Sequence, residues 1–368
     1  MSRVPPPTPG EGIAGPASVR PGFWRGRRVL LTGHTGFKGS WLSLWLQRMG
    51  AELTGFAAGV PSDPSLFVLA RVADGMRSID GDVRDHEALA RSLAAAEPEI
   101  VIHMAAQPLV RRSFAEPRLT YETNVMGTVN LLDAVRGAGG VRAVVNVTTD
   151  KCYENREWEW GYREDEPMGG HDPYASSKAC SELVTSAYRR SFFSSPDAAR
   201  LASARAGNVI GGGDWGEDRL VPDLARAAAA GRELRLRNPN SIRPWQHVLN
   251  PLGGYLLLAQ SLCESPAHAG AWNFGPPEDD ACPVSSVVER LAARWPGEVG
   301  WATDEGPHPH EARYLKLDSS RARQRLGWRP TVRLDDALTS IADWHRALAD
   351  RADMRAVTLA QIDALAGG

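Results

Sequence analysis

The sequence has few of the features that mark a secreted, metal-binding or nucleic-acid-binding protein. Its 368 residues include only four cysteines, Cys152, Cys180, Cys263 and Cys282. These lack paired metal-ligand spacing and are too few for a disulfide framework, so we expect free thiols and no metal site. The net charge of −2 gives no electrostatic reason to expect nucleic acid or an anionic membrane as a partner.

Long apolar runs are absent as well. No stretch is long and apolar enough to span a bilayer, and residues 1–22 have no apolar run of the kind that a signal peptide needs. We therefore expect a cytoplasmic protein. Because residues 1–22 are rich in proline and glycine, burial would not repay the entropy of ordering them, and we expect a disordered tail there.

Three glycines spaced three residues apart follow an apolar strand. The strand 29–31 leads into Gly33, Gly36 and Gly39, and residues 40–46 then form an apolar helical face. In a strand–turn–helix unit of this kind the first glycine allows a tight turn, the second lets the backbone approach a pyrophosphate, and the third lets helix and strand pack closely. The unpaired N–H groups of the helix start favour an anion, so the segment predicts a dinucleotide site.

Strands and helices continue to alternate after this unit. Repeated units of this kind predict an α/β fold with a doubly wound, Rossmann-type parallel sheet over residues 23–208. Beyond residue 208 the rhythm breaks, and we expect a smaller mixed α/β substrate-binding lobe at 209–350, partly interleaved with the sheet, and a C-terminal tail at 351–368. The expected strands are 52–57, 78–80, 100–106 and 142–147, and the expected helices are 85–96, 117–135, 174–190, 223–230, 285–295 and 334–348.

Tyr174 and Lys178 stand four residues apart on an expected helix, so their side chains share one face. An ammonium about 4 Å from a phenolate favours the ionised phenol by about 4 kcal/mol at an effective dielectric near 20, or roughly three pKa units. Tyr174 could then act as a base near neutral pH. The spacing alone also fits an ordinary surface pair on an amphipathic helix.

Thr149, Asp150 and Lys151 follow the strand 142–147 and place a hydroxyl, a carboxylate and an amine at one strand end. Active groups gather at the carboxyl ends of parallel strands. Asp150 could act as an acid if protonated and Lys151 as a base if neutral, and either state requires burial or charged neighbours. A plain strand end with a helix-capping aspartate remains the alternative.

Several motifs together resemble one family. The glycine segment 32–39, Asp82-Val83, the run 103–106, the segment 124–128 and the Tyr174/Lys178 pair are similar to the extended short-chain dehydrogenase/reductases. Four longer stretches are similar to their CDP-glucose 4,6-dehydratase branch. These are residues 33–42, 149–155, 167–174 and 205–215.

The resemblance implies a redox cycle on CDP-glucose with NAD as cofactor. Tyr174, helped by Thr149 and Lys178, would remove the proton of the sugar 4-hydroxyl while hydride passes from C4 to NAD. Asp150 and Lys151 would then serve as acid and base in loss of the C6 hydroxyl and the C5 proton. Return of hydride to C6 would give a CDP-4-keto-6-deoxyglucose.

The resemblance also implies the binding residues. Those expected to contact NAD are Gly33, Thr35, Gly36, Phe37, Lys38, Gly39, Asp82, Val83, Met104, Ala105, Ala106, Asn124, Tyr174 and Lys178. Those expected to contact the nucleotide sugar are Gln107, Asn208, Arg219, Arg243 and His247. Arg243 suits a diphosphate because its planar fork makes paired, charge-assisted contacts.

Two departures from the family pattern bear on the chemistry. Related dehydratases carry Asp-Glu after the threonine, whereas this chain has Asp150-Lys151, and lysine is a base only when neutral. The end of the second strand, residues 54–58, lacks the carboxylate that commonly binds the adenosine ribose of NAD. NAD is still the expected cofactor, and we expect it to be held loosely.

Other functions remain open at this point. The same tyrosine, lysine and fold would serve a dehydratase for another nucleotide sugar or an epimerase, although an epimerase would leave Asp150 and Lys151 idle. A non-catalytic dinucleotide-sensing protein is a third reading, because fold alone does not establish function. The resemblance further implies a homodimer or higher homo-oligomer that pairs through the helices expected at 117–135 and 174–190.

Overall fold

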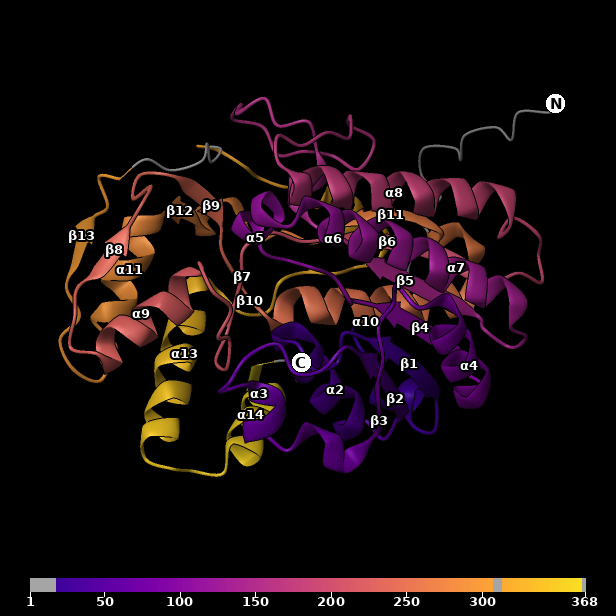
Figure 1. Cartoon of the computed structure of the whole chain (residues 1–368), viewed down its shortest axis with the longest axis horizontal. Helices are drawn as coiled ribbons and strands as arrows, with labels where there is room; N and C mark the ends of the chain where they lie inside the picture. The colour runs from indigo at the N-terminus through magenta and orange to yellow at the C-terminus, as the bar shows by residue number, and fades with distance from the viewer. Residues whose placement is uncertain (1–17, 307–312, 366–368) are drawn as a thin grey trace.

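The centre of the protein is a seven-stranded parallel sheet (Figure 1). The computed structural model describes residues 18–306 and 313–365, so the tail expected at 1–22 lies mostly outside the described residues. The strand order is β11-β6-β5-β4-β1-β2-β3, which confirms the predicted doubly wound Rossmann-type sheet. The strands are β1 Arg28–Thr32, β2 Glu52–Ala57, β3 Arg77–Asp80, β4 Ile100–His103, β5 Ala143–Val147, β6 Arg200–Arg205 and β11 Gly270–Asn273.

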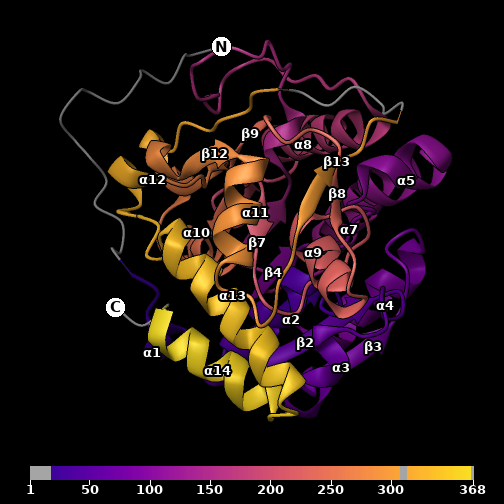
Figure 2. The same cartoon turned by 90° about the vertical axis from the view of Figure 1, so that its left-hand side faces the viewer.

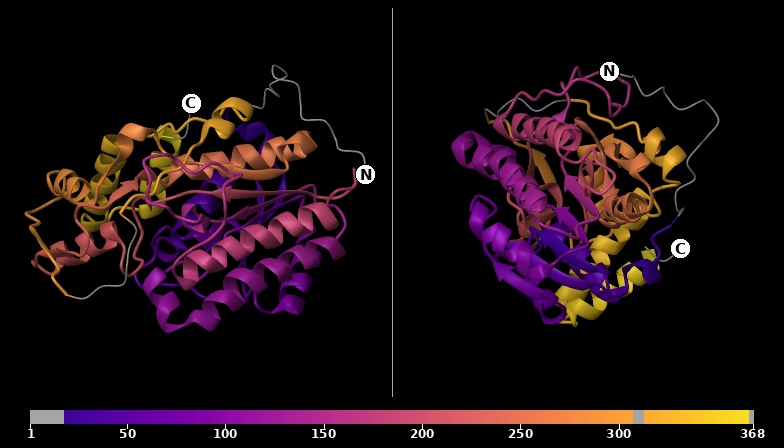
Figure 3. Two further views of the ribbon diagram at one scale, coloured as in Figure 1. Left: turned by 90° about the horizontal axis from the view of Figure 1, so that it is seen from above. Right: turned by 90° about the vertical axis from the view of Figure 1, so that its right-hand side faces the viewer.

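Helices cover both faces of the sheet, because alternate residues of each strand point to opposite sides. Leu31 of β1 packs in one core cluster with Trp41 of α2, while Leu30 packs in the other with Leu131 of α7. Figure 3 shows the two helical layers from two further sides. The first layer contains α2 Phe37–Arg48 and α10 Leu249–Glu264, and the second contains α4 His86–Ala96, α7 Gly127–Gly137 and α8 Pro173–Ser191.

Two elements differ from the sequence expectation near the carboxyl edge of the sheet. Strand β4 ends at His103 rather than continuing through residue 106, because the N–H groups of Met104 and Ala105 both donate to Thr32 Oγ1 at 3.1 Å. The helix expected at 117–135 is α6 Pro117–Tyr121, a π-helical turn Glu122–Met126 and then α7. The turn contains buried Asn124, whose side chain bonds the backbone of Gln107.

The second half of the chain builds a smaller lobe beyond one end of the sheet, seen face-on in Figure 2. The lobe is interleaved with the sheet, since α10 and β11 come from this half and join the central layers. Its main elements are α9 Leu220–Ala229, β8 Leu234–Leu236, α11 Val284–Ala292, β13 Trp301–Thr303 and α13 Leu334–Ala349. The smaller elements are α1 Pro21–Trp24, α3 Leu66–Leu69, α5 Val110–Ala115, α12 Ser320–Arg325, and the paired strands β7 Val209–Ile210 with β10 Gln246–His247 and β9 Ile242–Pro244 with β12 Ala281–Pro283.

The expectation of a C-terminal tail at 351–368 is wrong for the part that the structure describes. Residues Met354–Leu365 form helix α14, which packs against α2 and α13. Its buried residues Met354, Thr358 and Ile362 are spaced four apart and so share one face. Trp344 of α13 donates its indole N–H to Thr358 Oγ1 at 3.1 Å, which fixes the two helices together.

Candidate active site

The glycine turn between β1 and α2 has the geometry that a dinucleotide cradle needs. Gly33 has φ +75°, a conformation that L side chains rarely adopt, and a Cβ on Gly39 would lie 2.1 Å from Gly33 O. Gly36 begins α2 without any side-chain cap, which leaves backbone N–H groups at the helix start for an anion. Thr35 is buried, and Phe37 packs near Gly211.

This turn lies at the topological switch point, where β1 and β4 lie side by side and the chain leaves in opposite directions. Thr32 Oγ1 is 2.6 Å from His103 Nδ1, and the same oxygen accepts the two N–H groups of residues 104 and 105. The segment Met104, Ala105 and Ala106 therefore crosses next to Gly33. Of the other expected cofactor contacts, Val83 is buried against Gly127, and Asp82 pairs with Arg84, which lowers the pKa of the Asp82 carboxyl.

The five expected catalytic residues gather at the carboxyl end of β5. A short 3-10 turn, Asp150–Cys152, follows the strand and is capped by the Thr149 hydroxyl. That hydroxyl donates to Asp150 Oδ1 at 2.9 Å, and it also lowers the pKa of the Tyr174 phenol on α8 against the effect of burial. Lys178, one turn further along α8, donates to Val147 O at 3.2 Å. Thr149, Asp150, Tyr174 and Lys178 are all buried.

In this structure burial outweighs the acidification of Tyr174 that was expected from Lys178. Burial raises the pKa of Tyr174 to about 12, with the Thr149 hydrogen bond opposing that rise, Asp150 adding to it and Arg219 opposing it. Burial also lowers the pKa of Lys178 to about 8. Burial disfavours the charged form of both the Tyr174 phenol and the Lys178 amine. The amine donates its hydrogen bond to the Val147 carbonyl.

Asp150 has the environment of a group that can hold a proton. Burial raises the pKa of its carboxyl, although Lys151, the Thr149 hydroxyl and Arg243 oppose that rise. Its Oδ2 is buried and without a hydrogen-bond partner within the described residues. A Cβ on Gly207 would lie 2.1 Å from this oxygen, so the position after β6 needs a glycine. Lys151 is only partly buried beside it.

Three of the four lysines in the chain lie in this site, namely Lys38, Lys151 and Lys178. Lys38 is the least expected member, since the sequence analysis placed it among the cofactor contacts and not among the catalytic residues. Its amine donates to the phenol oxygen of Tyr255 on α10 at 2.9 Å. Burial, Lys178 and Arg219 lower the pKa of Lys38 to about 7, and Asp150 opposes them. The sequence analysis missed Tyr255, which lies in an apolar helix without a motif.

The expected substrate residues divide into two groups. Arg219 pairs with Asp214 at 3.1 Å and its charge acts on Tyr174, while the buried Arg243 acts on Asp150, so both lie at the cluster. Asn208 is partly buried, and its carbonyl accepts from the Gln246 N–H.

The second group is Gln107 and His247, and the expected cofactor residue Asn124 lies beside Gln107. The Gln107 side chain bonds Thr120 and the backbone of Leu109, and the Asn124 side chain bonds the Gln107 backbone and Ser177. His247 is fully buried, and burial lowers its pKa to about 3. The structure therefore gives these three side chains internal partners or core positions rather than a free face toward a ligand.

Comparison with known proteins identifies the family. A family model described as GDP-mannose 4,6 dehydratase matches residues 30–266. The chain belongs to this family. The CDP-glucose 4,6-dehydratase of Salmonella typhimurium is 55% identical over 337 residues, which cover 90% of this chain and 94% of that protein. This similarity confirms the resemblance found in the sequence motifs.

More distant relatives share the fold. The dTDP-glucose 4,6-dehydratase of Streptomyces venezuelae, solved with NAD bound, has a TM-score of 0.75 and 26% identity and covers 89% of this chain and 99% of its own. A UDP-glucose 4-epimerase of Stenotrophomonas maltophila, also with NAD, has a TM-score of 0.78 and 21% identity, covering 89% of this chain and 100% of its own. At this low identity the epimerase supports the fold alone.

Residues 18–306 and 313–365 have neither a membrane-spanning helix nor a cluster of metal ligands. None of the helices in these ranges is both long and apolar enough to cross a bilayer. The same ranges contain no group of three or more histidine, cysteine, aspartate or glutamate residues that could hold a metal ion. All four cysteines lie within these ranges and none is in a disulfide.

Proposed function

We propose that this protein is an NAD-dependent hydro-lyase that converts CDP-glucose to CDP-4-keto-6-deoxyglucose. The observation that carries the proposal is one buried cluster in which Thr149 links the phenol of Tyr174 to the carboxyl of Asp150. An oxidation at C4 needs the first group and an elimination across C5 and C6 needs the second. The 55% identity to a CDP-glucose 4,6-dehydratase supports both the reaction and the cytidine nucleotide.

The glycine turn fits NAD. A Cβ at Gly33 or Gly39 would collide with backbone, and the uncapped start of α2 suits a pyrophosphate. We propose that Gly33, Gly36 and Gly39 approach the cofactor, with residues 104–106 beside them. Bound NAD would accept a hydride from sugar C4 and later return it to C6, so the cofactor is not consumed.

Each proposed step is a proton transfer to or from one side chain of the cluster. Tyr174 takes the proton of the sugar 4-hydroxyl, and the Thr149 hydroxyl favours the phenolate by lowering the pKa of Tyr174. Asp150, whose pKa burial raises, gives a proton to the departing C6 hydroxyl, which leaves as water. Lys151 in its neutral form takes the C5 proton, which the 4-ketone has acidified. Arg219 and Arg243 are placed to hold the diphosphate of the nucleotide sugar.

The deciding experiment supplies CDP-, dTDP-, GDP- and UDP-hexoses with NAD and measures the 4-keto-6-deoxy chromophore. We expect product from CDP-glucose at a kcat/KM well above that with the other nucleotides. Tyr174→Phe should abolish turnover while thermal unfolding is unchanged. Tyr188→Phe is the matched control, since it makes the same change on α8 at a tyrosine that packs edge-to-face against Phe192. Simple C4 epimerisation, or full turnover by Tyr174→Phe, would refute the proposal.

We also propose a cytoplasmic homodimer that pairs through α8 and the α6–α7 region. Several apolar side chains on these neighbouring elements are exposed: Tyr121 at 38%, Met126 at 49% and Leu183 at 59%. An exposed apolar surface of this kind suits a second copy of the chain. Leu183→Glu should shift the mass measured by light scattering toward the monomer, and an unchanged mass would contradict this interface.

A further inference from the structure

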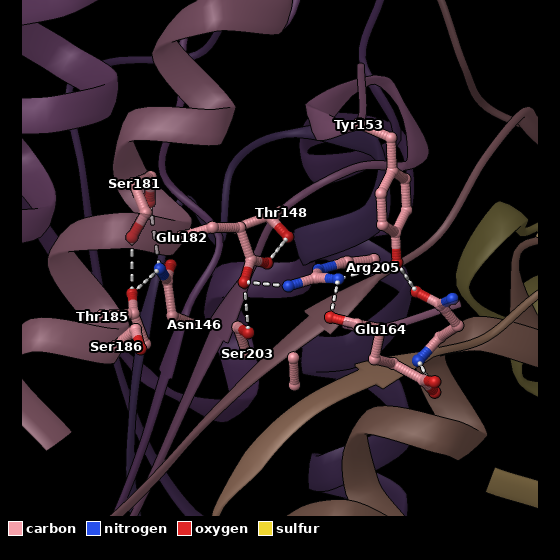
Figure 4. Close-up of polar contacts among 12 residues, drawn as sticks. Asn146, Thr148, Tyr153, Glu164, Ser181, Glu182, Thr185, Ser186, Ser203 and Arg205 are labelled. Carbon is pink, nitrogen blue, oxygen red and sulfur yellow. Dashed lines mark hydrogen bonds and ion pairs between the residues drawn. The ribbon is translucent and has the colours of Figure 1, made fainter. Parts of the chain in front are cut away.

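A buried polar network lies directly behind the proposed active site (Figure 4). Its centre is Glu182 on α8, whose side chain is 4% exposed. One carboxylate oxygen accepts from Thr148 Oγ1, and the other accepts from Ser203 Oγ and from Arg205 Nη2, both at 2.7 Å. These three donors hold the carboxylate ionised, and its pKa is lowered although burial opposes this.

The network shares its helix face with the proposed catalytic pair. Tyr174, Lys178 and Glu182 are spaced four residues apart along α8, so their side chains form one row. Lys178 bonds the carbonyl of Val147, and Glu182 bonds the hydroxyl of Thr148, the next residue. These two anchors hold α8 on the end of β5 immediately before Thr149, so they set the position of Thr149 relative to Tyr174.

Glu182 also acts on the charge of Lys178. Glu182 on the same helix and the Cys152 thiol on the turn after β5 act on the charge of Lys178, while Lys178 in turn lowers the pKa of His103 at the end of β4 and of Lys38 on α2. Burial disfavours the ammonium, while Glu182 and then Cys152 favour it, which leaves the pKa of Lys178 at about 8. The Cys152 thiol is itself kept neutral by burial, so Glu182 is the neighbouring anion.

Arg205 holds the far side of the carboxylate. Its other terminal nitrogen, Nη1, donates to Tyr153 Oη at 2.7 Å and to Glu164 O at 3.0 Å. The guanidinium is therefore fixed by β6, by the segment after β5 and by Glu182, and the side chain is 4% exposed. A planar, forked donor suits this position because it can satisfy three acceptors in fixed directions.

We infer that Glu182 is a positioning residue of the active site, which, held by Arg205, Thr148 and Ser203, keeps the Lys178 ammonium charged and fixed beside Tyr174 and Thr149. This inference rests on the proposed function, because it presumes that Tyr174 and Lys178 act in the reaction. Glu182 itself lies behind Lys178 and acts only through it.

The test is the pH dependence of kcat/KM for CDP-glucose between pH 6 and 9. In the wild type we expect a fall with an apparent pKa near 8 as Lys178 loses its proton. Glu182→Gln keeps the shape but removes the charge, so Lys178 should lose its proton about one pH unit lower. That shift gives about an eightfold loss at pH 8.5 and almost none at pH 6. The KM for CDP-glucose should stay within about twofold, because the effect is on proton transfer.

Thr185→Val is the matched control. Thr185 lies on the same helix and is buried, and its hydroxyl accepts from Asn146 at 2.7 Å, so the variant disturbs a contact between α8 and β5 without changing charge. It should lower the unfolding temperature but leave the pH profile in place. An equal shift in both variants would overturn the inference, since a loss of packing alone would then explain it.

A second variant covers the case in which Glu182→Gln does not fold because Arg205 is left buried without a partner. In Glu182→Gln/Arg205→Met both charges are removed, which is often nearly neutral for stability. The same downward shift should appear. A wild-type profile that is flat from pH 7 to 9, or a folded variant that keeps the wild-type profile, would overturn the inference. Tyr174→Phe with full activity, or no product from CDP-glucose, would instead overturn the proposed function.

Discussion

Lys38 offers a test of the site electrostatics that does not depend on the reaction. Its side chain is only partly buried, yet desolvation, Lys178 and Arg219 lower the pKa of Lys38 from 10.5 to about 7. A lysine pKa lowered this far means that the charged side chain destabilises the folded state. Replacement by methionine, which has a similar length and no charge, should therefore stabilise the protein at neutral and acidic pH.

The size of the effect follows from the displacement of the pKa. At 1.36 kcal/mol per unit the cost of the charged form is at most roughly 5 kcal/mol, and solvent around the partly exposed chain reduces it by about half. Tyr255 loses the donor that lies 2.9 Å from its oxygen, which costs about 1 kcal/mol. We expect Lys38→Met to raise the free energy of unfolding by about 1.5 kcal/mol at pH 6.

The sign of the pH dependence is fixed by linkage. Between pH 7 and 10.5 the unfolded chain keeps the Lys38 proton and the folded chain does not, so wild-type stability gains from Lys38 as pH rises. The advantage of the variant should shrink by about 1.5 kcal/mol between pH 6 and 9. Urea unfolding followed by tryptophan fluorescence at several pH values measures both quantities.

Lys316→Met provides the control for Lys38→Met. Burial disfavours the charge of Lys316, but Glu278 at 2.7 Å and Tyr314 raise its pKa, so the same substitution should destabilise. A Lys38→Met protein less stable than the wild type at pH 6, or an advantage that does not change with pH, would refute the proposed origin of the lowered pKa of Lys38.

Three further predictions concern the reaction and the cradle. Asp150→Asn cannot donate a proton, so product formation should fall by about 10²-fold or more while the absorbance of reduced cofactor accumulates; an ordinary rate would assign the acid to another group. Thr149→Val removes the hydroxyl that lowers the pKa of Tyr174, so the acidic limb of the pH profile of kcat/KM should move to higher pH. An unchanged acidic limb would show that Thr149 does not set the pKa of Tyr174. Gly39→Ala would place a Cβ 2.1 Å from Gly33 O, and we expect a loss of about 2 kcal/mol in unfolding free energy together with NAD binding; calorimetry showing neither would contradict the cradle.

The sheet was predictable because its signals are local. β1, the glycine turn and α2 follow one another in sequence, and each β-α unit repeats the same alternation of apolar strand and amphipathic helix. Helix α10 was missed for a physical reason: nearly all of its residues are buried, so it lacks the polar face that gives a helical period. Strand β11 was missed because it joins the sheet only through pairing with β6, far away in sequence.

The members of the candidate site were predictable, but their charge states were not. The spacing of Tyr174 and Lys178 placed both on one face of a helix, which α8 confirms. Spacing carries no information about burial, and burial decided the sign of the pKa shift at Tyr174. Spacing also could not show that the Lys178 amine donates a hydrogen bond to the Val147 carbonyl, because Val147 is on another element, strand β5.

One compositional signal could have identified the cluster. The chain has 38 arginines and four lysines, and three of those four lysines lie at the end of β5, at the start of α2 and on α8. Arginine keeps its charge at every accessible pH, so an arginine-rich chain gains nothing from lysine at an ordinary surface position but needs it where an amine must release a proton. Crowding adds to this, because the charge of Lys178 lowers the pKa of Lys38. Three of the four lysines in this chain lie around Asp150, the buried carboxyl that we propose as the acid.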